Sequence, residues 1–390
     1  MQKKTAINYR LLEELIRFES YKEDEKIKCS SRISQEFLNI GFDVKTYREY
    51  GAPIIYAHYD AEATKDILFY MHYDVKPAGD ISAWNMSPFD LYYDANHNKL
   101  YGRGTGDDKG QIYAAIKGIE RAIGSAKQLN YNVSVLIEGD EENSSPGLEA
   151  FVKNEINGKF YDKVVVLDSH WLKNSPVIYL GCRGQLDVAI EYENERMNND
   201  YHAGNFGGIY DGACRYLLAV LNLFMTDAEK FINNANSNNR GTIKNAISMT
   251  YFSSGDAKRS LIPKAAISRI DIRYIDVSVA ENIIELLNYY VESYGITYDI
   301  KQREDGFYNK ANLSHVNEMK SIIEDVTSLN VIIQDYCGAY LPLNKMKDIA
   351  GIKYILPLAQ TDENNHAPNE NIAIDNLLYG IEIINRILVN

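Results

Sequence analysis

The stretch DILFYMHYDV, residues 66–75, is an apolar run that ends in a histidine and an aspartate. Its aromatic and branched residues predict a buried β-strand. Side chains two residues apart on a strand point to the same face, so we expect His72 and Asp74 to share a face at the end of this strand. One of them could then ligate a metal ion while the other orients the imidazole.

Further carboxylates and a histidine follow other apolar stretches of the chain. NVSVLIEGDEE (132–142) ends in Glu141 and Glu142, KVVVLDSHW (163–171) contains Asp168, and the loop NNHAPNE (364–370) contains His366. Each feature alone is typical of a surface or structural residue. Open α/β sheets build their sites at the carboxyl ends of strands, so together these residues predict a metal site.

The glycine-rich loop YGRGTGDDKG, residues 101–110, first suggests a phosphate site. A dinucleotide-binding fingerprint needs G-x-G-x-x-G, whereas these glycines recur at every second residue and Asp107 stands in the third glycine's place. A Walker loop needs G-K-[ST], but here the order is Lys109-Gly110. Two adjacent carboxylates would also repel a phosphate. Hard cations prefer carboxylate oxygens, so metal binding is the better interpretation.

The pattern of apolar residues predicts two kinds of domain. Strands alternate with helices up to about residue 180, which indicates an α/β layered domain. After Gly184 the strands alternate apolar and polar residues around two helices, which fits a small α+β domain of ferredoxin-like type with β-α-β-β-α-β order. We therefore expect residues 1–183 and 308–390 to form a catalytic domain and residues 184–307 an inserted lid and dimerisation domain. The asparagine-rich stretch 232–245 is expected to be a surface loop.

Composition excludes several function classes. The formal net charge of −13 and the pI of about 5.1 argue against a nucleic-acid surface. No apolar run approaches the length of a membrane span, and the N-terminus is typical of an amphipathic helix rather than a signal peptide. The four cysteines are far apart and form no CxxC pair, which predicts reduced thiols and a cytoplasmic protein.

Several motifs, in order, resemble the M20 family of co-catalytic zinc peptidases, and most closely its carnosinase-like dipeptidase branch. They are residues 71–111 (MHYDVKPAGDISAWNMSPFDLYYDANHNKLYGRGTGDDKGQ), EGDEENSSPGL (138–148), YLGCRG (179–184), HAGNFGG (202–208), SLIPKAAISRIDIRY (260–274) and HAPNE (366–370). The resemblance covers nearly the whole chain. It implies a zinc-exopeptidase-type mixed β-sheet flanked by helices, with an inserted ferredoxin-like lid domain.

The resemblance also implies the roles of the strand-end residues. Asp107 would bridge two divalent metal ions, zinc in the first place with cobalt or manganese as alternatives. The remaining ligands would be His72 and Asp168 for one ion, and Glu142 and His366 for the other. Asp74 would orient His72. Glu141 would be the general base that takes a proton from a water between the ions and passes it to the leaving amine. The family further has a cis peptide bond at the position of Asp107–Asp108.

The inserted domain is expected to complete the site. By resemblance, His202 would stabilise the oxyanion, often in the active site of a dimer partner, and Arg273 would hold the free carboxylate of the substrate. Ser260 would place a hydroxyl near the substrate. These roles imply a homodimer that forms through the lid domain. The histidines that match no motif are interpreted as surface or packing residues, namely His58, His97, His170 and His315.

Departures from the family pattern concern the substrate more than the chemistry. Ser144 replaces a glycine of the family, and Tyr340 in GAYLP (338–342) stands where the branch has a serine, which narrows the substrate pocket but keeps a hydroxyl. The leading hypothesis is hydrolysis of peptide bonds in dipeptides or short peptides. The alternative is an N-acyl-amino-acid amidohydrolase that uses the same site. A non-catalytic scaffold is disfavoured because every implied metal ligand and Glu141 are present.

Overall fold

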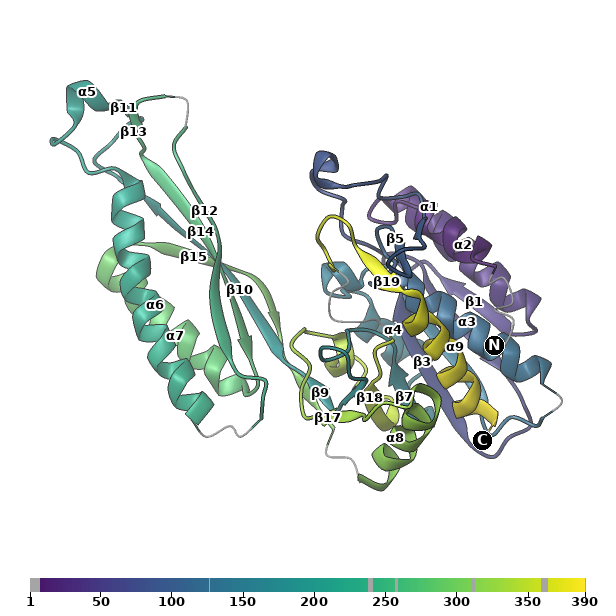
Figure 1. The fold of residues 1–390 in the computed structure, drawn as a ribbon. Helices are drawn as coiled ribbons and strands as arrows, with labels where there is room; N and C mark the ends of the chain where they lie inside the picture. The colour runs from purple at the N-terminus through teal and green to yellow at the C-terminus, as the bar shows by residue number, and fades with distance from the viewer. Residues whose placement is uncertain are drawn as a thin grey trace. The chain divides into compact units, whose positions relative to one another are not determined.

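The computed structural model describes residues 8–125, 127–237, 241–256, 259–309, 313–358 and 364–389. It divides into two compact units, each with its own hydrophobic core (Figure 1). Unit 1 comprises Met1–Gly181, Tyr308–Gln334 and Pro342–Asn390, and unit 2 comprises Cys182–Phe307 and Asp335–Leu341. The short strands β9 (Gly181–Cys182) and β16 (Phe307–Tyr308) lie where the chain passes from one unit to the other. The catalytic and lid roles of the two units stay predictions.

Unit 1 contains an α/β arrangement of helices and strands. Its helices are α1 (Arg10–Arg17), α2 (Glu23–Asn39), α3 (Lys109–Gly124), α4 (Leu148–Glu155), α8 (Leu313–Thr327) and α9 (Ile374–Val389), with the short 3-10 helices η1 (Ile81–Ala83), η2 (Glu141–Asn143) and η3 (Pro342–Asn344). Its strands are β1 (Asp43–Tyr47), β2 (Ile54–Tyr59), β3 (Asp66–His72), β4 (Tyr92–Asp94), β5 (Lys99–Tyr101), β6 (Asn132–Glu138), β7 (Phe160–Val166), β8 (Val177–Tyr179), β17 (Ile332–Gln334), β18 (Ala350–Ile355) and β19 (Asn371–Ala373).

The central sheet of unit 1 has eight strands in the order β1-β2-β6-β3-β7-β18-β8-β17. Strand β3 pairs in parallel with both β6 and β7, whereas β2 pairs antiparallel with β6 and β18 antiparallel with β8. The sheet is therefore mixed, as the sequence predicts. Because β6, β3 and β7 run the same way, their carboxyl ends meet at one edge.

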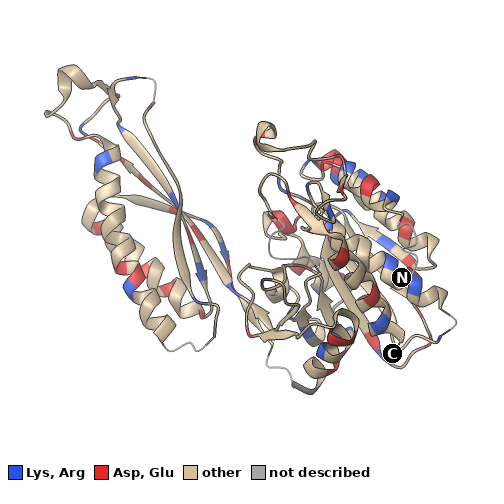
Figure 2. Cartoon of the chain, in the orientation of Figure 1, with Lys and Arg blue, Asp and Glu red and all other residues tan. Residues whose placement is uncertain are grey.

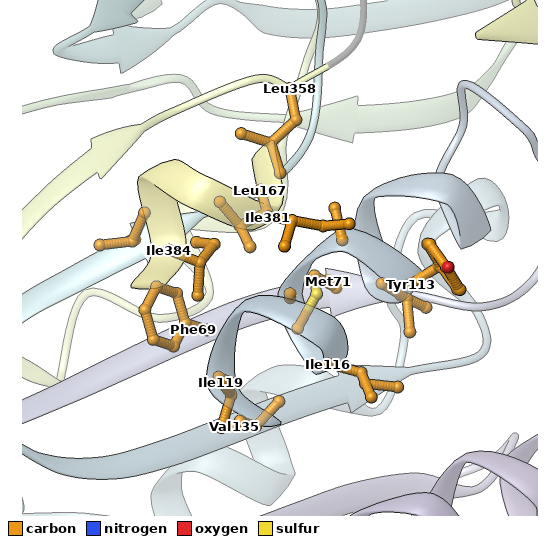
Figure 3. Close-up of a cluster of buried hydrophobic side chains, with 14 of the residues drawn as sticks. Phe69, Met71, Tyr113, Ile116, Ile119, Val135, Leu167, Leu358, Ile381 and Ile384 are labelled. Carbon is orange, nitrogen blue, oxygen red and sulfur yellow. The ribbon is translucent and has the colours of Figure 1, made fainter. Parts of the chain in front are cut away.

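The core of unit 1 lies between this sheet and its helices. Alternate side chains of β3, Phe69 and Met71 among them, pack with Ile116 and Ile119 of α3 and with side chains of α9 (Figure 3). Helices α3 and α9 approach closely because position 118 is a glycine, where an added Cβ would lie 2.6 Å from the Cβ of Ile384. The intervening β3 side chains are buried as well, and burial on both faces explains the nearly continuous apolar run.

The predicted amphipathic helix near the N-terminus is confirmed. In α1 the apolar residues Leu11, Leu12, Leu15 and Ile16 are buried. Lysines, arginines and acidic residues alternate along α1 and α2 (Figure 2), and many of them form ion pairs within one helix. Most of the charge of these helices therefore lies on their solvent side, whereas Lys26 of α2 is buried and pairs with Asp140.

Unit 2 has the β-α-β-β-α-β order of a ferredoxin-like domain. Its elements are β10 (Gly184–Glu193), α6 (Ala213–Ser237), β12 (Ala246–Ser254), β14 (Ala265–Tyr274), α7 (Val277–Tyr294) and β15 (Thr297–Glu304), with the smaller β11 (Tyr201–His202), α5 (Ala203–Phe206) and β13 (Leu261–Ile262). The four long strands are antiparallel in the order β12-β14-β10-β15. The predicted order is thus present, and β12 is the strand that the sequence pattern did not locate.

One local prediction in unit 2 is wrong. The stretch 232–245 was expected to be a loop, but α6 continues to Ser237. Ile232 follows Ala228 at helical spacing and both are buried, so the apolar face of the helix extends beyond the asparagines. Residues 238–240 of that stretch lie outside the described residues.

Candidate metal centre

The carboxyl ends of three neighbouring parallel strands bring the predicted residues together. His72 is the last residue of β3, and Asp168 lies just beyond the end of β7. Glu141 and Glu142 form the start of η2, which follows β6. The order β6-β3-β7 therefore places all of these side chains at one edge of the sheet.

Five of the predicted residues form two groups that share one aspartate. The first ligand group is His72, Asp107 and Asp168, and the second ligand group is Asp107, Glu142 and His366; within each group one donor atom per residue lies within 4.8 Å of the others. Asp107 Oδ1 lies 2.9 Å from His72 Nε2, and Asp107 Oδ2 lies 3.1 Å from His366 Nε2. Each oxygen of Asp107 thus faces a different group, which is the arrangement that a bridging carboxylate needs.

The contacts of the His72 imidazole indicate which ring nitrogen would ligate a metal ion. His72 Nδ1 lies 3.2 Å from the carbonyl oxygen of Asp74 and 3.3 Å from Asp74 Oδ1, and both of these atoms are acceptors. The Nδ1 atom therefore donates to these acceptors, and Nε2, which faces Asp107 and Asp168, would be the nitrogen that ligates a metal ion. This geometry agrees with the predicted orienting role of Asp74.

Asp74 also holds the turn that carries Glu141 and Glu142. Its Oδ1 accepts a hydrogen bond from the backbone N–H of Glu141 at 3.2 Å, and its Oδ2 accepts one from that of Glu142 at 3.0 Å. Asp74 therefore connects the β3 end with the β6 end of the site. The sequence does not indicate this second contact, because it joins segments that are far apart in the chain.

The electrostatics of the site fit divalent cations. Burial, together with Asp107 and Glu142, raises the pKa of Asp168 to about 7. Burial also raises the pKa of Glu141 well above its usual range, with Asp168 and Glu142 adding to the effect. Crowded, buried carboxylates disfavour their own ionised forms, and a bound cation removes that penalty. Imidazole nitrogens with carboxylate oxygens are a donor set that Zn²⁺ accepts.

Glu142 adds a direct observation in favour of a cation. Its Oε2 lies 3.3 Å from Lys76 Nζ, whereas its Oε1 lies 3.0 Å from His366 Nε2. Burial lowers the pKa of His366, but Asp107 and Glu142 outweigh it and raise that pKa to about 10. A metal ion between the imidazole and the carboxylates would take the place of that proton.

The glycine-rich loop holds an anion, and this anion is a side chain of the protein itself. Glu370 Oε1 accepts backbone hydrogen bonds from Gly104 at 2.9 Å, Gly106 at 3.0 Å and Asp107 at 3.1 Å. The N–H groups that a phosphate would use are therefore occupied by a buried carboxylate. Sequence reasoning missed Glu370, although it ends the motif HAPNE that carries His366.

The two aspartates of the loop have different surroundings. The bond between Asp107 and Asp108 is a cis peptide, as the resemblance implies. Asp108 is fully buried, and its Oδ2 accepts a hydrogen bond from the backbone N–H of His72 at 3.2 Å. Asp107 therefore faces both ligand groups, whereas Asp108 fixes the end of β3.

The close packing of this loop makes one glycine sensitive to substitution. A methyl group at Gly110, in the first turn of α3, would lie 1.9 Å from the carbonyl oxygen of Thr105. We expect Gly110→Ala to lower the free energy of unfolding by about 1–3 kcal/mol, the usual cost of overpacking, in denaturant titrations. Gly124→Ala is the matched control, because a methyl group at this last residue of α3 meets no atom within 4 Å. Equal unfolding free energies for the two variants would contradict this account.

In unit 2, His202 and Ser260 lie side by side. His202 is the last residue of β11 and pairs with Leu261 of β13. The next residue, Ala203, donates its N–H to the carbonyl oxygen of Ser260 at 2.9 Å. His202 is exposed, so its imidazole is available to a ligand or a partner.

Arg273 and Tyr340 each contact an acidic residue of unit 2. Arg273, near the end of β14, donates from Nε to Asp271 Oδ1 at 2.7 Å. The Tyr340 hydroxyl lies 3.3 Å from Glu304 Oε2, which accepts its hydrogen bond, and the side chain is largely buried. Within unit 2 the segment of Tyr340 is held by Arg183, which donates from Nε to the carbonyl oxygen of Gly338 at 2.9 Å. Substrate binding by either residue stays a prediction.

Among the histidines without a motif, His58 and His97 make contacts outside the ligand groups. His58 Nδ1 lies 3.0 Å from Ser134 Oγ, between neighbouring strands of the sheet. His97 is exposed and its Nδ1 lies 2.7 Å from Asp94 Oδ2. These contacts agree with packing and surface roles.

Comparison with known proteins identifies the family. The model of peptidase family M20/M25/M40 matches residues 68–390. The chain belongs to this peptidase family. The M20 peptidases are hydrolases that use divalent metal ions.

Individual M20 relatives match over part of their length. A Cys-Gly metallodipeptidase DUG1 of Candida albicans is 34% identical over 184 residues, which is 46% of this chain and 38% of the relative. A Beta-Ala-His dipeptidase of Rattus norvegicus is 35% identical over 173 residues, which is 43% of this chain and 34% of the relative. The matched parts therefore span little more than a third of these relatives' own length.

A solved M20 structure shares the fold over nearly the whole chain. The dipeptidase Dug1p of Saccharomyces cerevisiae has a TM-score of 0.80 at 19% identity, and the match covers 97% of this chain and 94% of that chain. This likeness supports the predicted fold class, the mixed sheet flanked by helices. None of the helices in the described ranges has both the length and the apolar character that a membrane span requires.

Proposed function

We propose that this chain is a metal-dependent hydrolase that cleaves the peptide bond of dipeptides or short peptides. The observation that carries the proposal is the position of Asp107, whose two oxygens face His72 and His366 in two separate ligand groups. The names of the M20 relatives, a Cys-Gly metallodipeptidase and a Beta-Ala-His dipeptidase, favour dipeptides as the substrate class.

The ligand groups would hold two divalent ions. His72, Asp107 and Asp168 would hold one, and Asp107, Glu142 and His366 the other. Zinc is proposed because these residues offer imidazole nitrogen and carboxylate oxygen, with cobalt or manganese as alternatives. Two bound ions supply Lewis acidity that polarises the scissile carbonyl and makes water more acidic.

Glu141 would move the proton of the reaction. It lies next to Glu142 in η2 and belongs to neither ligand group. Burial raises its pKa well above the usual range, whereas two bound cations would favour the ionised form that accepts a proton. A group of this kind can accept a proton from the attacking water and return it to the leaving amine.

The geometry of unit 2 favours a site shared between two chains. His202 lies beside β13, just before the start of β14, whereas Arg273 lies near the far end of β14. A ten-residue strand spans about 30 Å, whereas an extended dipeptide spans only about 7 Å. The His202 and Arg273 of one chain therefore cannot both contact one dipeptide, so we propose that His202 acts in the site of a partner subunit.

A surface of unit 2 is suited to such a homodimer. Strand β12 is an edge of the four-stranded sheet and exposes Met249 and Tyr251, which are 47% and 52% accessible. Helix α6, which packs beside β12, exposes Leu218 and Leu223. An exposed edge strand with apolar side chains favours pairing with a second chain. We propose that this surface joins two lid domains.

Metal dependence and substrate class can be tested together. We expect the chelator-treated protein to lose hydrolysis of dipeptides and to regain it when about two zinc ions per chain are returned. The measurement is amine release from a panel of dipeptides and of N-acetyl and N-succinyl amino acids. Cleavage of only the acyl compounds would assign the protein to the N-acyl-amino-acid amidohydrolases. Binding of no ion by the wild-type protein would reject the two-metal proposal.

A further inference from the structure

A buried ion pair joins the glycine-rich loop to the segment that carries His366. Arg103 Nη1 lies 2.7 Å from Glu370 Oε2, and the two side chains are 1% and 0% accessible. Arg103 also lies over the ring of Trp84, 5.3 Å from its centre. Neither partner of the pair belongs to a ligand group, but both form hydrogen bonds with the backbone of residues that do.

Each partner of the pair contacts the backbone of a different ligand. Glu370 Oε1 accepts the N–H of Asp107, whereas Arg103 Nη2 donates to the carbonyl oxygen of His366 at 3.2 Å. His366 has a φ of 62°, in the left-handed region that a non-glycine residue adopts only where its surroundings hold it. The Arg103 guanidinium supplies part of that support.

The two residues that belong to the first ligand group alone, His72 and Asp168, are held by other contacts. His72 ends a central strand, and its backbone N–H and its imidazole are bonded to Asp108 and Asp74. Asp168 follows β7, which pairs with β3 and with β18. Within the described ranges Arg103 forms no hydrogen bond or ion pair with His72 or Asp168, so a change at Arg103 acts mainly on His366.

We propose that Arg103 is a positioning residue for the second ligand group. Its guanidinium donates to both Glu370 and the carbonyl oxygen of His366, and these contacts set the affinity of the second ligand group for its metal ion. The proposal rests on the two-metal function proposed above. Outer contacts of this kind typically change metal affinity by about 10- to 100-fold when they are removed. The loss of affinity should concern one ion, because Arg103 donates to the backbone of His366, which belongs to the second ligand group alone.

Arg103→Lys separates this role from the charge of the pair. A lysine keeps a cation beside Glu370, but its single ammonium group lacks the planar fork that reaches Glu370 and the carbonyl oxygens of His366 and Pro77 together. We expect the variant to bind one Zn²⁺ as the wild type does, within about twofold, and the other at least about tenfold more weakly.

The experiment is equilibrium dialysis of the purified full chain against buffered Zn²⁺ alone, with the bound metal measured per chain. Arg121→Lys is the matched control, since Arg121 pairs with Glu382 at 2.9 Å on the surface. Neither residue of this pair belongs to a ligand group. A second comparison uses His366→Ala, which removes one ligand of the second group. In that background Arg103→Lys should cause no further loss of Zn²⁺.

The outcomes separate this inference from the proposed function. Wild-type protein that binds no Zn²⁺ would reject the two-metal function, and the positioning role would fall with it. Wild-type protein with two ions and an Arg103→Lys variant with unchanged affinities, or with both affinities weakened equally, would overturn the positioning role alone. If Arg103→Lys does not fold, the double variant Arg103→Met with Glu370→Gln, which buries no charge, is measured instead. If neither variant folds, the Arg103–Glu370 pair is required for the stability of the fold, and its proposed role in the affinity of one metal ion is overturned.

Discussion

Glu141→Ala is expected to leave a folded protein that binds two zinc ions but hydrolyses its substrate about a thousandfold more slowly. A positioned acid–base group contributes about 10²- to 10⁴-fold to a rate. Glu141 lies outside both ligand groups, and its turn is held through backbone N–H groups by Asp74, contacts that an alanine retains. The loss should therefore appear in kcat with the metal content unchanged.

The measurement pairs steady-state kinetics with metal analysis of the same preparation. Glu149→Gln is the matched control, because this nearby glutamate is exposed in α4 and belongs to neither ligand group. Wild-type turnover by Glu141→Ala would remove the base assignment. Loss of one ion from Glu141→Ala would instead indicate that this residue is a ligand.

Mixing two inactive variants is expected to restore activity if the site is shared. In a dimer of one His202→Ala chain and one Glu141→Ala chain, the first chain supplies Glu141 and the second supplies His202 to the same site. Random exchange between equal amounts of the two variants would make about a quarter of all sites complete, because half of the dimers are mixed and each has one complete site. Each variant alone should be nearly inactive.

The control mixture combines Glu141→Ala with Arg273→Ala. If Arg273 acts within its own chain, no site in the mixed dimer has both residues, and activity should stay absent. If activity recovers in this mixture and not in the first, Arg273 acts in the partner's site and His202 in the site of its own chain. No recovery in either mixture, after exchange has been verified with labelled subunits, would contradict a shared site.

The sequence indicates the candidate ligand residues because their signals are local. His72 and Asp168 follow apolar strand runs, and a period of two residues along a strand fixes which side chains share a face. The spacing of the glycines and the adjacent carboxylates excludes a phosphate site at 101–110 without reference to any other segment. The resemblance adds the pairing of the ligands into two groups around Asp107, and the geometry agrees with that pairing.

Residues whose role depends on distant partners could not be predicted in the same way. Glu370 accepts hydrogen bonds from a loop that lies more than 250 positions earlier in the chain. Asp74 reaches the backbone of Glu142 across 68 positions. Strand β12 shows only a weak alternation of apolar and polar residues. Its side chains range from half-buried to exposed, as is common in edge strands.

The sequence by itself therefore determined the fold class and the candidate strand-end ligands, through short-range periodicity, residue type and the family resemblance. Only the tertiary structure decided what the glycine-rich loop holds, that Asp108 accepts the backbone N–H of His72, and that His202 and Arg273 lie toward opposite ends of unit 2. These features depend on hydrogen bonds and strand lengths that exist only after distant segments have packed. Local sequence patterns alone do not specify which hydrogen-bonding groups of distant segments will meet.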